Sequence, residues 1–239
     1  MEQPQTSKYR NQRGNVLFMI LAAVALFAAL GFAMTQSSIG TGEIDREEAR
    51  IAAIEILQYA KAVKEAARKQ VLLGKATYNQ LCFYHPDFPG SPNNYGGGAC
   101  TPQRQVFDAE GGGMTYWNPD VKWLDSSFSS ESQFGHFNYF GDHKIQGIGT
   151  NKADLLMGIH YIKEDLCREI NRLVDMPFPP PDDNLCCGWD ATRHYRGDDD
   201  GDWDDAGGSF GGDYAGKSAA CVKETDADGY FFYYVLHAR

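Results

Sequence analysis

The sequence lacks the short motifs by which many hydrolases and dehydrogenases are identified. It contains no G-x-S-x-G elbow, no dinucleotide-binding glycine pattern and no H-E-x-x-H zinc motif. The six histidines are scattered, and Asp142–His143 is too small a constellation to assemble a catalytic site. These absences exclude the reactions that depend on such motifs, and we predict that the protein is not an enzyme.

Positive charge is scarce. The 239 residues include 22 Lys and Arg against 32 Asp and Glu, for a net charge of −10. The first fourteen residues run against this trend, because Lys8, Arg10 and Arg13 outnumber Glu2 and leave a net +2. The remainder is therefore still more acidic than the whole chain. A surface of that charge repels a phosphate backbone, so we exclude nucleic acid as a partner.

Closely spaced cysteine pairs are also missing. No C-x2-C occurs, which disfavours a structural zinc site. The six cysteines all lie beyond the apolar segment near the N-terminus, and an even count on one side of a membrane anchor is typical of disulfides in an oxidising compartment. We therefore predict three disulfides among Cys82, Cys100, Cys167, Cys186, Cys187 and Cys221.

The order of the cysteines suggests a pairing without fixing it. Cys82–Cys100 would close a loop that is rich in turn residues. Residues 186–187 are adjacent, and a bridge between neighbours is strained, so each should seek a distant partner. With Cys82–Cys100 assumed, Cys167 and Cys221 would take one each. A Cys167–Cys221 bridge would instead leave the adjacent pair without distant partners, unless Cys82 and Cys100 also paired differently.

One long apolar run is present near the N-terminus. Val16 to Ala33 is eighteen residues without a charge, and as a helix it would span about 27 Å, close to the thickness of a bilayer core. Basic residues precede the run and the first acid after it is Glu43, which predicts a cytoplasmic N-terminus and an exported remainder. A cleaved secretory signal is the alternative, because Gly31-Phe32-Ala33 would permit cleavage before Met34.

The stretch "QRGNVLFMILAAVALFAALGFA" resembles the N-terminus of the type IV pilin and type II secretion pseudopilin superfamily. In that superfamily a short basic leader ends in Gly, and a prepilin peptidase cuts after this Gly at the cytoplasmic face. The resemblance implies processing between Gly14 and Asn15. It also implies an anchor in the bacterial inner membrane and contacts with other pilin-like subunits through the N-terminal helix.

Met19 is the fifth residue of the predicted mature chain, where the family usually carries Glu. A carboxylate inside a bilayer is costly unless it is paired, and in the family it is thought to meet a neighbour's terminal ammonium during assembly. Minor, tip-located pseudopilins also tend to lack this Glu. The departure therefore favours a minor pilin-like subunit over the major subunit of a filament shaft.

Four segments follow from these patterns. We expect a leader over residues 1–14, a transmembrane helix over 15–35, a helical stalk over 36–75 and a periplasmic or extracellular head over 76–239. The stalk is rich in helix formers, and Gly74 is a natural stop. Its apolar residues fall at helical spacing, namely Ile56, Ala60, Val63, Ala67 and Val71. The predicted fold class is α+β: a long N-terminal helix, half membrane and half amphipathic, packed on a small antiparallel sheet with long disulfide-bonded loops.

Several head segments have their own signals. A strand near Ile145 and Ile148, a strand over residues 153–162 and a helix from about Lys163 to Val174 are expected. The closing run "GYFFYYVLHAR" predicts a strand that is buried on both faces. The residues Met114, Tyr116, Val121 and Trp123 suit buried strand positions. An aromatic sugar-binding patch is the alternative there, although core packing is the preferred interpretation.

An acidic cluster is the sharpest local signal of the head. Six Asp fall within eight residues around Gly201, and a hard cation would relieve their mutual repulsion. Some pseudopilins carry structural calcium in a C-terminal loop, so the resemblance adds weight to a calcium site. The alternative is a solvated acidic loop, because the order differs from that of an EF-hand. The predicted ligands are Asp198, Asp200, Asp202, Asp204 and Asp205.

The sequence therefore predicts a minor pilin-like or pseudopilin-like structural subunit of an envelope filament or secretion assembly. The alternative is a membrane-anchored binding head, such as an adhesin or a glycan-binding module, that never polymerises. The N-terminus of the mature protein separates these two hypotheses, since only the first requires Asn15 in that position.

Overall fold

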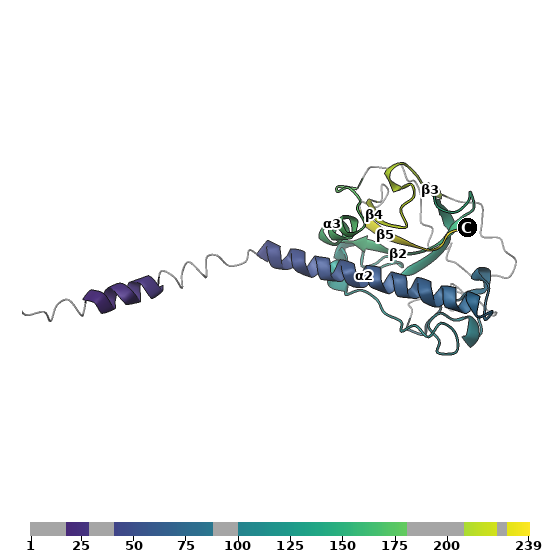
Figure 1. Ribbon diagram of the computed structural model, residues 1–239, viewed down its shortest axis with the longest axis horizontal. Coiled ribbons are helices and arrows are strands. Elements are labelled where there is room, and N and C mark those ends of the chain that lie inside the picture. The colour runs from purple at the N-terminus through teal and green to yellow at the C-terminus, as the bar shows by residue number, and fades with distance from the viewer. Residues whose placement is uncertain (1–17, 29–40, 88–99, 181–207, 224–228) are drawn as a thin grey trace, which may run out of the picture. The chain divides into compact units, whose positions relative to one another are not determined.

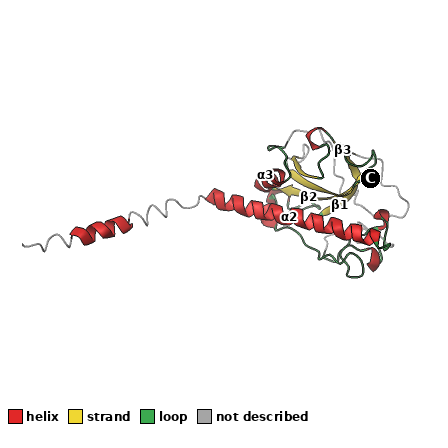
Figure 2. Cartoon of the chain, viewed as in Figure 1, coloured by secondary structure: helices red, strands yellow, loops and turns green. Residues whose placement is uncertain are grey.

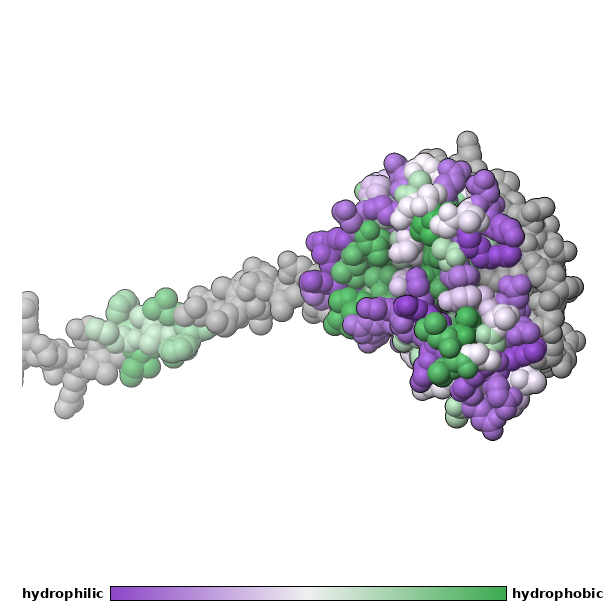
Figure 3. All heavy atoms as spheres, turned by 45° about the vertical axis from the view of Figure 1, so that its right-hand side comes forward, coloured by the Kyte–Doolittle hydropathy of each residue, from purple (hydrophilic) through white to green (hydrophobic). Residues whose placement is uncertain are grey.

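The computed structural model describes residues 18–28, 41–87, 100–180, 208–223 and 229–239 (Figure 1). The chain divides into two compact units, Met1–Asp45 and Arg46–Arg239. In the first unit, residues 18–28 form a helix whose side chains are exposed, and its apolar character is visible in Figure 3. Among the described residues, no helix combines the length and apolar character needed to cross a membrane. The predicted span extends past this helix on both sides, where it lies outside the described residues.

Helix α2, Thr41–Leu72, is the longest element. From Arg46 onward it belongs to the second unit, and there the predicted stripe is buried: Ile56, Ala60, Val63 and Ala67 are inaccessible, while Val71 is half-buried. Gly74 ends the helix with a positive φ of 68°, and its amide donates to the Val71 carbonyl at 3.0 Å. The helix predicted from the apolar spacing and its stop at Gly74 are thus confirmed over the described residues.

The second unit contains a five-stranded sheet in the order β3-β1-β2-β5-β4 (Figures 1 and 2). Its strands are β1 (Asn138–Ile145), β2 (Asp154–Ile162), β3 (Gly208–Phe210), β4 (Ala219–Lys223) and β5 (Tyr230–His237). Three neighbouring pairs are antiparallel, but β3 runs parallel to β1. The predicted α+β class is confirmed, whereas the sheet is mixed and not antiparallel as we expected. A three-residue edge strand carries too little pattern for its direction to be predicted.

The segment from β2 to helix α3 follows the sequence closely. Strand β2 is buried along its whole length, and α3 spans Glu164–Leu173, within the predicted helix. Gly158 lies inside β2, where a side chain would collide with the ring of Phe231 on the neighbouring strand. Strand β1 ends at Ile145, so Ile148 lies beyond the strand that we expected to include it.

The sheet is buried on both faces, and β5 shows the alternation directly. Its residues Phe232 and Leu236 belong to a core cluster that also contains the buried stripe of α2 and residues of α3. Phe231 and Tyr233 belong to a second cluster on the opposite face, together with Phe210 of β3. The two-sided burial predicted for the C-terminal strand is confirmed, and α2 lies along one side of the strands (Figure 2).

Short 3-10 turns connect these elements. They cover Tyr78–Gln80, Pro102–Arg104, Val121–Trp123, Ser126–Phe128 and Gly212–Tyr214. The strand positions expected between residues 114 and 123 are therefore wrong. Met114, Tyr116 and Trp123 are half-buried in irregular backbone, and Val121 is 61% exposed. This segment packs against α2 through individual side chains and not through a ladder of backbone hydrogen bonds. Its fold therefore does not depend on the alternating side-chain pattern of a strand.

Candidate functional site

The processing and metal predictions fall on residues that the structure does not describe. The cleavage site between Gly14 and Asn15 lies outside the described residues, as do Cys186 and Cys187. The same holds for the predicted calcium ligands Asp198, Asp200, Asp202, Asp204 and Asp205. Within the described parts of the chain, no group of three or more His, Cys, Asp or Glu is arranged to hold a metal ion. Processing and calcium binding therefore stay predictions.

The Cys82–Cys100 bridge is present, as the flanking turn residues suggested. Cys82 is buried, and its backbone forms an isolated parallel β-bridge with Gln105. The Cys82 amide donates to the Arg104 carbonyl, and the Cys82 carbonyl accepts from the Val106 amide. The two Cα atoms are 5.8 Å apart, a normal span for a disulfide. The bridge fixes the base of the loop that it closes.

The second bridge corrects the expected pairing. Cys167 bonds to Cys221, whereas the sequence had favoured one bridge from each to the adjacent pair at residues 186–187. The reason is packing: α3 lies against the edge strand β4, so the two Cα atoms come within 5.4 Å. Sequence spacing carries no information on which helix covers which strand, and the predicted pairing was wrong for that reason.

Asn171 reinforces the contact between α3 and β4, a role that the sequence did not predict. Its amide nitrogen donates to the Cys221 carbonyl and its amide oxygen accepts from the Cys221 amide, both at 2.8 Å. One fully buried side chain thereby satisfies both backbone groups of an edge-strand residue, which would otherwise be available for pairing with another strand. The available signal was its position four residues after Cys167, one helical turn along the same face of α3.

A buried carboxylate links α3 to the second unit's part of α2. Glu169 is 2% exposed and accepts hydrogen bonds from Arg46 at 3.2 Å and Arg172 at 2.7 Å. Burial by itself would raise the pKa of Glu169, but the bonds from Arg172 and Arg46 outweigh it, so the pKa lies below its ordinary value. The carboxylate stays charged at neutral pH and acts as a tie between two helices.

A run of letters in the loop before β4 fits the phosphate-binding consensus G-x-x-x-x-G-K-S, from Gly211 to Ser218. A phosphate cradle needs this loop between a strand and a helix, but here strand β4 follows it. The donors of this loop are also engaged elsewhere. The Gly216 amide donates to the Gln146 carbonyl at 2.7 Å, and the Lys217 side-chain ammonium donates to the Asp175 carbonyl at 3.0 Å. The loop is a closed turn, and it offers no phosphate site.

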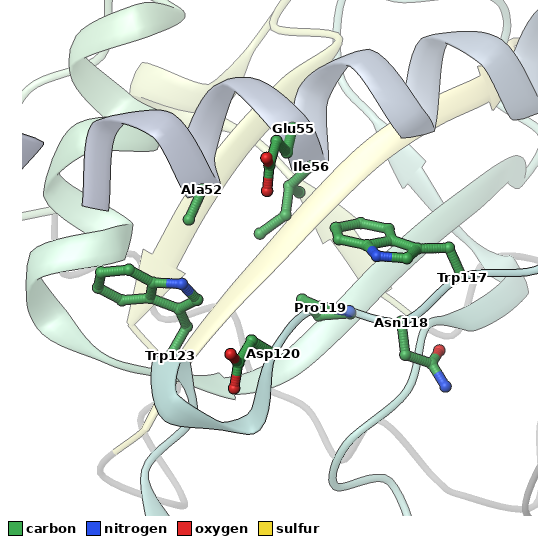
Figure 4. Close-up of a pocket in the computed structure, with 8 residues that line it drawn as sticks. All are labelled: Ala52, Glu55, Ile56, Trp117, Asn118, Pro119, Asp120 and Trp123. Carbon is green, nitrogen blue, oxygen red and sulfur yellow. The ribbon is translucent and has the colours of Figure 1, made fainter. Parts of the chain in front are cut away.

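The best candidate for a binding site is a cavity of about 230 Å³ between α2 and the segment that follows Tyr116 (Figure 4). Two tryptophans stand at opposite ends of the hollow, and one carboxylate lies on each of its two walls. All of these groups belong to the second unit. The lining residues are Ala52, Glu55, Ile56, Trp117, Asn118, Pro119, Asp120 and Trp123.

The Trp117 end of the cavity is held by aromatic packing. Its backbone amide donates to the Tyr59 hydroxyl at 3.2 Å, and its ring meets that of Tyr59 edge-on with centroids 5.1 Å apart. Tyr59 stacks in turn on Phe137 of the core. Burial raises the pKa of the Tyr59 hydroxyl, so it remains neutral and keeps its hydrogen bond. Trp117 is therefore fixed by side chains from two different elements.

The Trp123 end is held by the backbone. The Trp123 carbonyl accepts from the Lys163 amide at 2.8 Å, and Leu124 forms an isolated antiparallel bridge with Ile162 at the end of β2. Asp120 caps the short turn before Trp123 by accepting from the Lys122 amide at 2.9 Å. The Trp123 end is thus anchored to the end of β2 and to the residue that precedes α3.

Lys122 lies beside the cavity without being one of its lining residues. Its ammonium contacts the Glu48 carboxylate at 3.3 Å and stands 5.0 Å from the centre of the Trp123 ring. The cavity itself carries two carboxylates and no basic side chain. Such a lining attracts a positively charged or hydrogen-bonding guest and repels an anion. Of the two tryptophans, Trp123 is expected in the core from the sequence, whereas Trp117 has no such signal beyond its place directly before the turn-forming Asn118-Pro119-Asp120.

Comparisons with known proteins add no identity to this picture. No protein-family model matches the chain, and neither a curated protein nor a solved structure shows significant similarity to it.

Proposed function

We propose that this protein is a minor pilin-like subunit, anchored in a bacterial inner membrane with an exported head. The support is the order of elements along the chain: an apolar segment, a long helix, a disulfide-bonded head and a C-terminal strand. Contacts with other pilin-like subunits would be made through the N-terminal helix. Other stalked membrane proteins can share this order, so the proposal needs a direct test of processing.

One observation carries the proposal. The part of α2 that belongs to the second unit packs its alanine-rich stripe on one face of the sheet, in the same cluster as Phe232 and Leu236 of the last strand. A helix that continues an N-terminal apolar segment and then becomes a structural part of the head is the arrangement that the resemblance implies. A simple tether would have no reason to bury one face in the core.

The mature N-terminus tests this proposal. In the Gly14→Trp variant the prepilin peptidase should fail to cut, and the chain should keep the leader of about fourteen residues that the wild type loses. Intact-mass measurement of the purified full-length protein reads this difference directly. The expected wild-type chain begins at Asn15.

Ala33→Trp is the matched control, because it blocks ordinary signal cleavage before Met34 and leaves Gly14 untouched. If the wild type and Gly14→Trp have the same N-terminus, the pilin-like proposal fails. A wild-type chain that begins at Met34, with cleavage lost in Ala33→Trp, would identify a secretory signal.

A second candidate function is a membrane-anchored binding head that does not polymerise. The observation that favours it is the cavity lined by Trp117 and Trp123, because core packing does not require two tryptophans to border a hollow. An unprocessed chain, beginning at Met1, that still binds a ligand in this cavity would support the second candidate over the first.

A further inference from the structure

We propose that the cavity lined by Trp117, Trp123, Glu55 and Asp120 binds an organic cation, namely an alkylammonium group. The group can belong to a free amine or to a lysine side chain of a partner. This inference goes beyond the pilin-like proposal and does not rest on it, because every contributing residue belongs to the second unit, Arg46–Arg239.

Charge is the first step. Glu55 reaches the cavity from α2 and Asp120 from the opposite wall (Figure 4), so a guest between them meets two carboxylates. No lysine, arginine or histidine is among the lining residues, and the ammonium of Lys122, which precedes the lining residue Trp123, is already paired with Glu48 at 3.3 Å. Charge complementarity therefore favours a cation and rejects phosphates, sulfates and carboxylates.

The aromatic groups are the second step. Tryptophan attracts cations over its ring face more strongly than tyrosine or phenylalanine does, with about 0.5–2 kcal/mol per contact. Trp123 already makes one such contact, because the Lys122 ammonium lies 5.0 Å from its ring centre. Two indoles at opposite ends of a hollow give a cation with methyl or methylene groups apolar contact on both sides.

Rigidity is the third step. The Trp117 ring packs against Tyr59 and lies 5.9 Å from Phe137, and the Trp123 backbone is bonded to the start of α3. Asp120 is held by its own cap hydrogen bond. The Trp117 ring and the Asp120 carboxylate are thus positioned before a guest arrives, which lowers the entropy lost on binding.

Size sets the class of guest. A cavity of about 230 Å³ is smaller than the roughly 300–1,000 Å³ of pockets for drug-sized ligands. It suits one ammonium head group with its substituents, and it is too small for a nucleotide or an oligosaccharide. A single sugar ring would also fit by volume and stack on the indoles, so the experiment must separate a neutral sugar from a cation.

The test is a titration of the full-length protein, in a nonionic polyoxyethylene detergent that contains neither ammonium nor sugar groups. Tetramethylammonium chloride replaces sodium chloride at constant ionic strength, and the four indole N–H signals are followed by NMR after assignment with Trp→Phe variants. We expect the signals of Trp117 and Trp123 to shift and to saturate together. Glucose and sodium acetate, at the same concentrations, should leave both signals unchanged.

Two substitutions remove charge with little effect on folding. Glu55→Gln changes an exposed side chain, and Asp120→Asn keeps a cap acceptor. Each should weaken binding about two- to fivefold, while Trp123→Ala should weaken it about 3- to 30-fold. Glu65→Gln is the matched control, since it is exposed on the same helix about 15 Å further along the axis.

Two outcomes would overturn the proposal: no saturable shift at Trp117 and Trp123, or a shift that survives the Glu55→Gln, Asp120→Asn double variant unchanged. Saturable shifts with glucose alone would assign the cavity to sugars instead. A lysine-containing peptide and its acetyl-lysine counterpart distinguish the sources of the cation. Tighter binding of the charged peptide than of tetramethylammonium identifies a partner's side chain, and equal binding of the two cations identifies a free amine.

Discussion

The two faces of the sheet are held in different ways. On the face that α2 and α3 cover, small and aliphatic residues far outnumber the five buried rings of Phe83, Phe107, Phe137, Tyr139 and Phe232. Long-range ties also cross this face: the Cys167–Cys221 bridge, the Asn171 amide and the buried Glu169. On the opposite face rings make up five of the eleven buried residues in the cluster: Phe140, Phe210, Tyr214, Phe231 and Tyr233. We call these the helix face and the aromatic face.

The difference reflects what each kind of covering needs. A helix that approaches a sheet through alanines makes close but shallow contact, so it can slide along the strands unless specific bonds fix it. Aromatic rings instead fill volume and interlock. Phe210, for example, lies 4.8 Å from Tyr233 and 6.4 Å from Tyr214 between ring centres. The disulfide and Asn171 tie α3 to β4, and Glu169 ties α3 to α2, so these bonds fix the helices that cover the helix face.

The strongest test of this comparison uses neighbouring residues of β5. Phe231→Ala on the aromatic face and Phe232→Ala on the helix face each empty a fully buried site, at about 3–5 kcal/mol. Phe231 also packs against the rings of Phe140 and His160, so its loss should cost about 0.5–1.5 kcal/mol more. Urea denaturation of both variants measures the two values. A larger loss in Phe232→Ala would contradict the assignment of ring packing to the aromatic face.

The two disulfides can be compared directly, because Cys167–Cys221 joins a helix to a strand whereas Cys82–Cys100 closes a loop. Cys167→Ala with Cys221→Ala opens a bridge that spans 54 residues, and Cys82→Ala with Cys100→Ala opens one that spans 18. Chain entropy predicts losses of about 4 and about 3 kcal/mol. Hydrogen exchange should show the first pair loosening α3 and β4 and the second leaving them protected. Equal deprotection of α3 in both variants would mean that the bridge is not what fixes the helix.

The smallest expected effect is the pH dependence of the Glu169 tie. The pKa of Glu169 is lowered in the folded state, so its contribution is present above its ordinary pKa of 4.5 and is lost as pH falls through the lower folded value. Glu169→Gln should cost about 1–2 kcal/mol at pH 7, because both arginines are partly exposed and water screens the charge.

The same variant should flatten the stability profile on the acid side, measured by urea denaturation from pH 7 to below pH 4. Glu164→Gln is the control, since Glu164 is exposed on the same helix and, among the described residues, forms its ion pair with Arg168 at 2.6 Å. It should change stability by less than about 0.5 kcal/mol. Matching profiles for the two variants would show that Glu169 does not tie the helices.

Local patterns predicted the elements whose signals are contained in their own residues. The stripe of α2, the strand and helix around Gly158 and Lys163, and the two-sided strand β5 all follow from periodicities of 3.6 or 2. Predictions failed where the backbone is irregular, between residues 114 and 123, and where a three-residue strand joins the edge of the sheet. In both places the conformation is set by contacts with distant segments.

The sequence by itself determined the α+β class, the buried face of α2 and the charge of the chain, because each depends on composition or on residues close together along the chain. It suggested the Cys82–Cys100 bridge without fixing it. Only the tertiary structure decided that β3 is parallel to β1, that Cys167 pairs with Cys221 and that Glu169 meets Arg46. It also decided that Trp117 and Trp123 face a common hollow, while the G-x-x-x-x-G-K-S run forms a closed turn. These choices depend on which surfaces pack together, and packing is settled by shape and burial over the whole head.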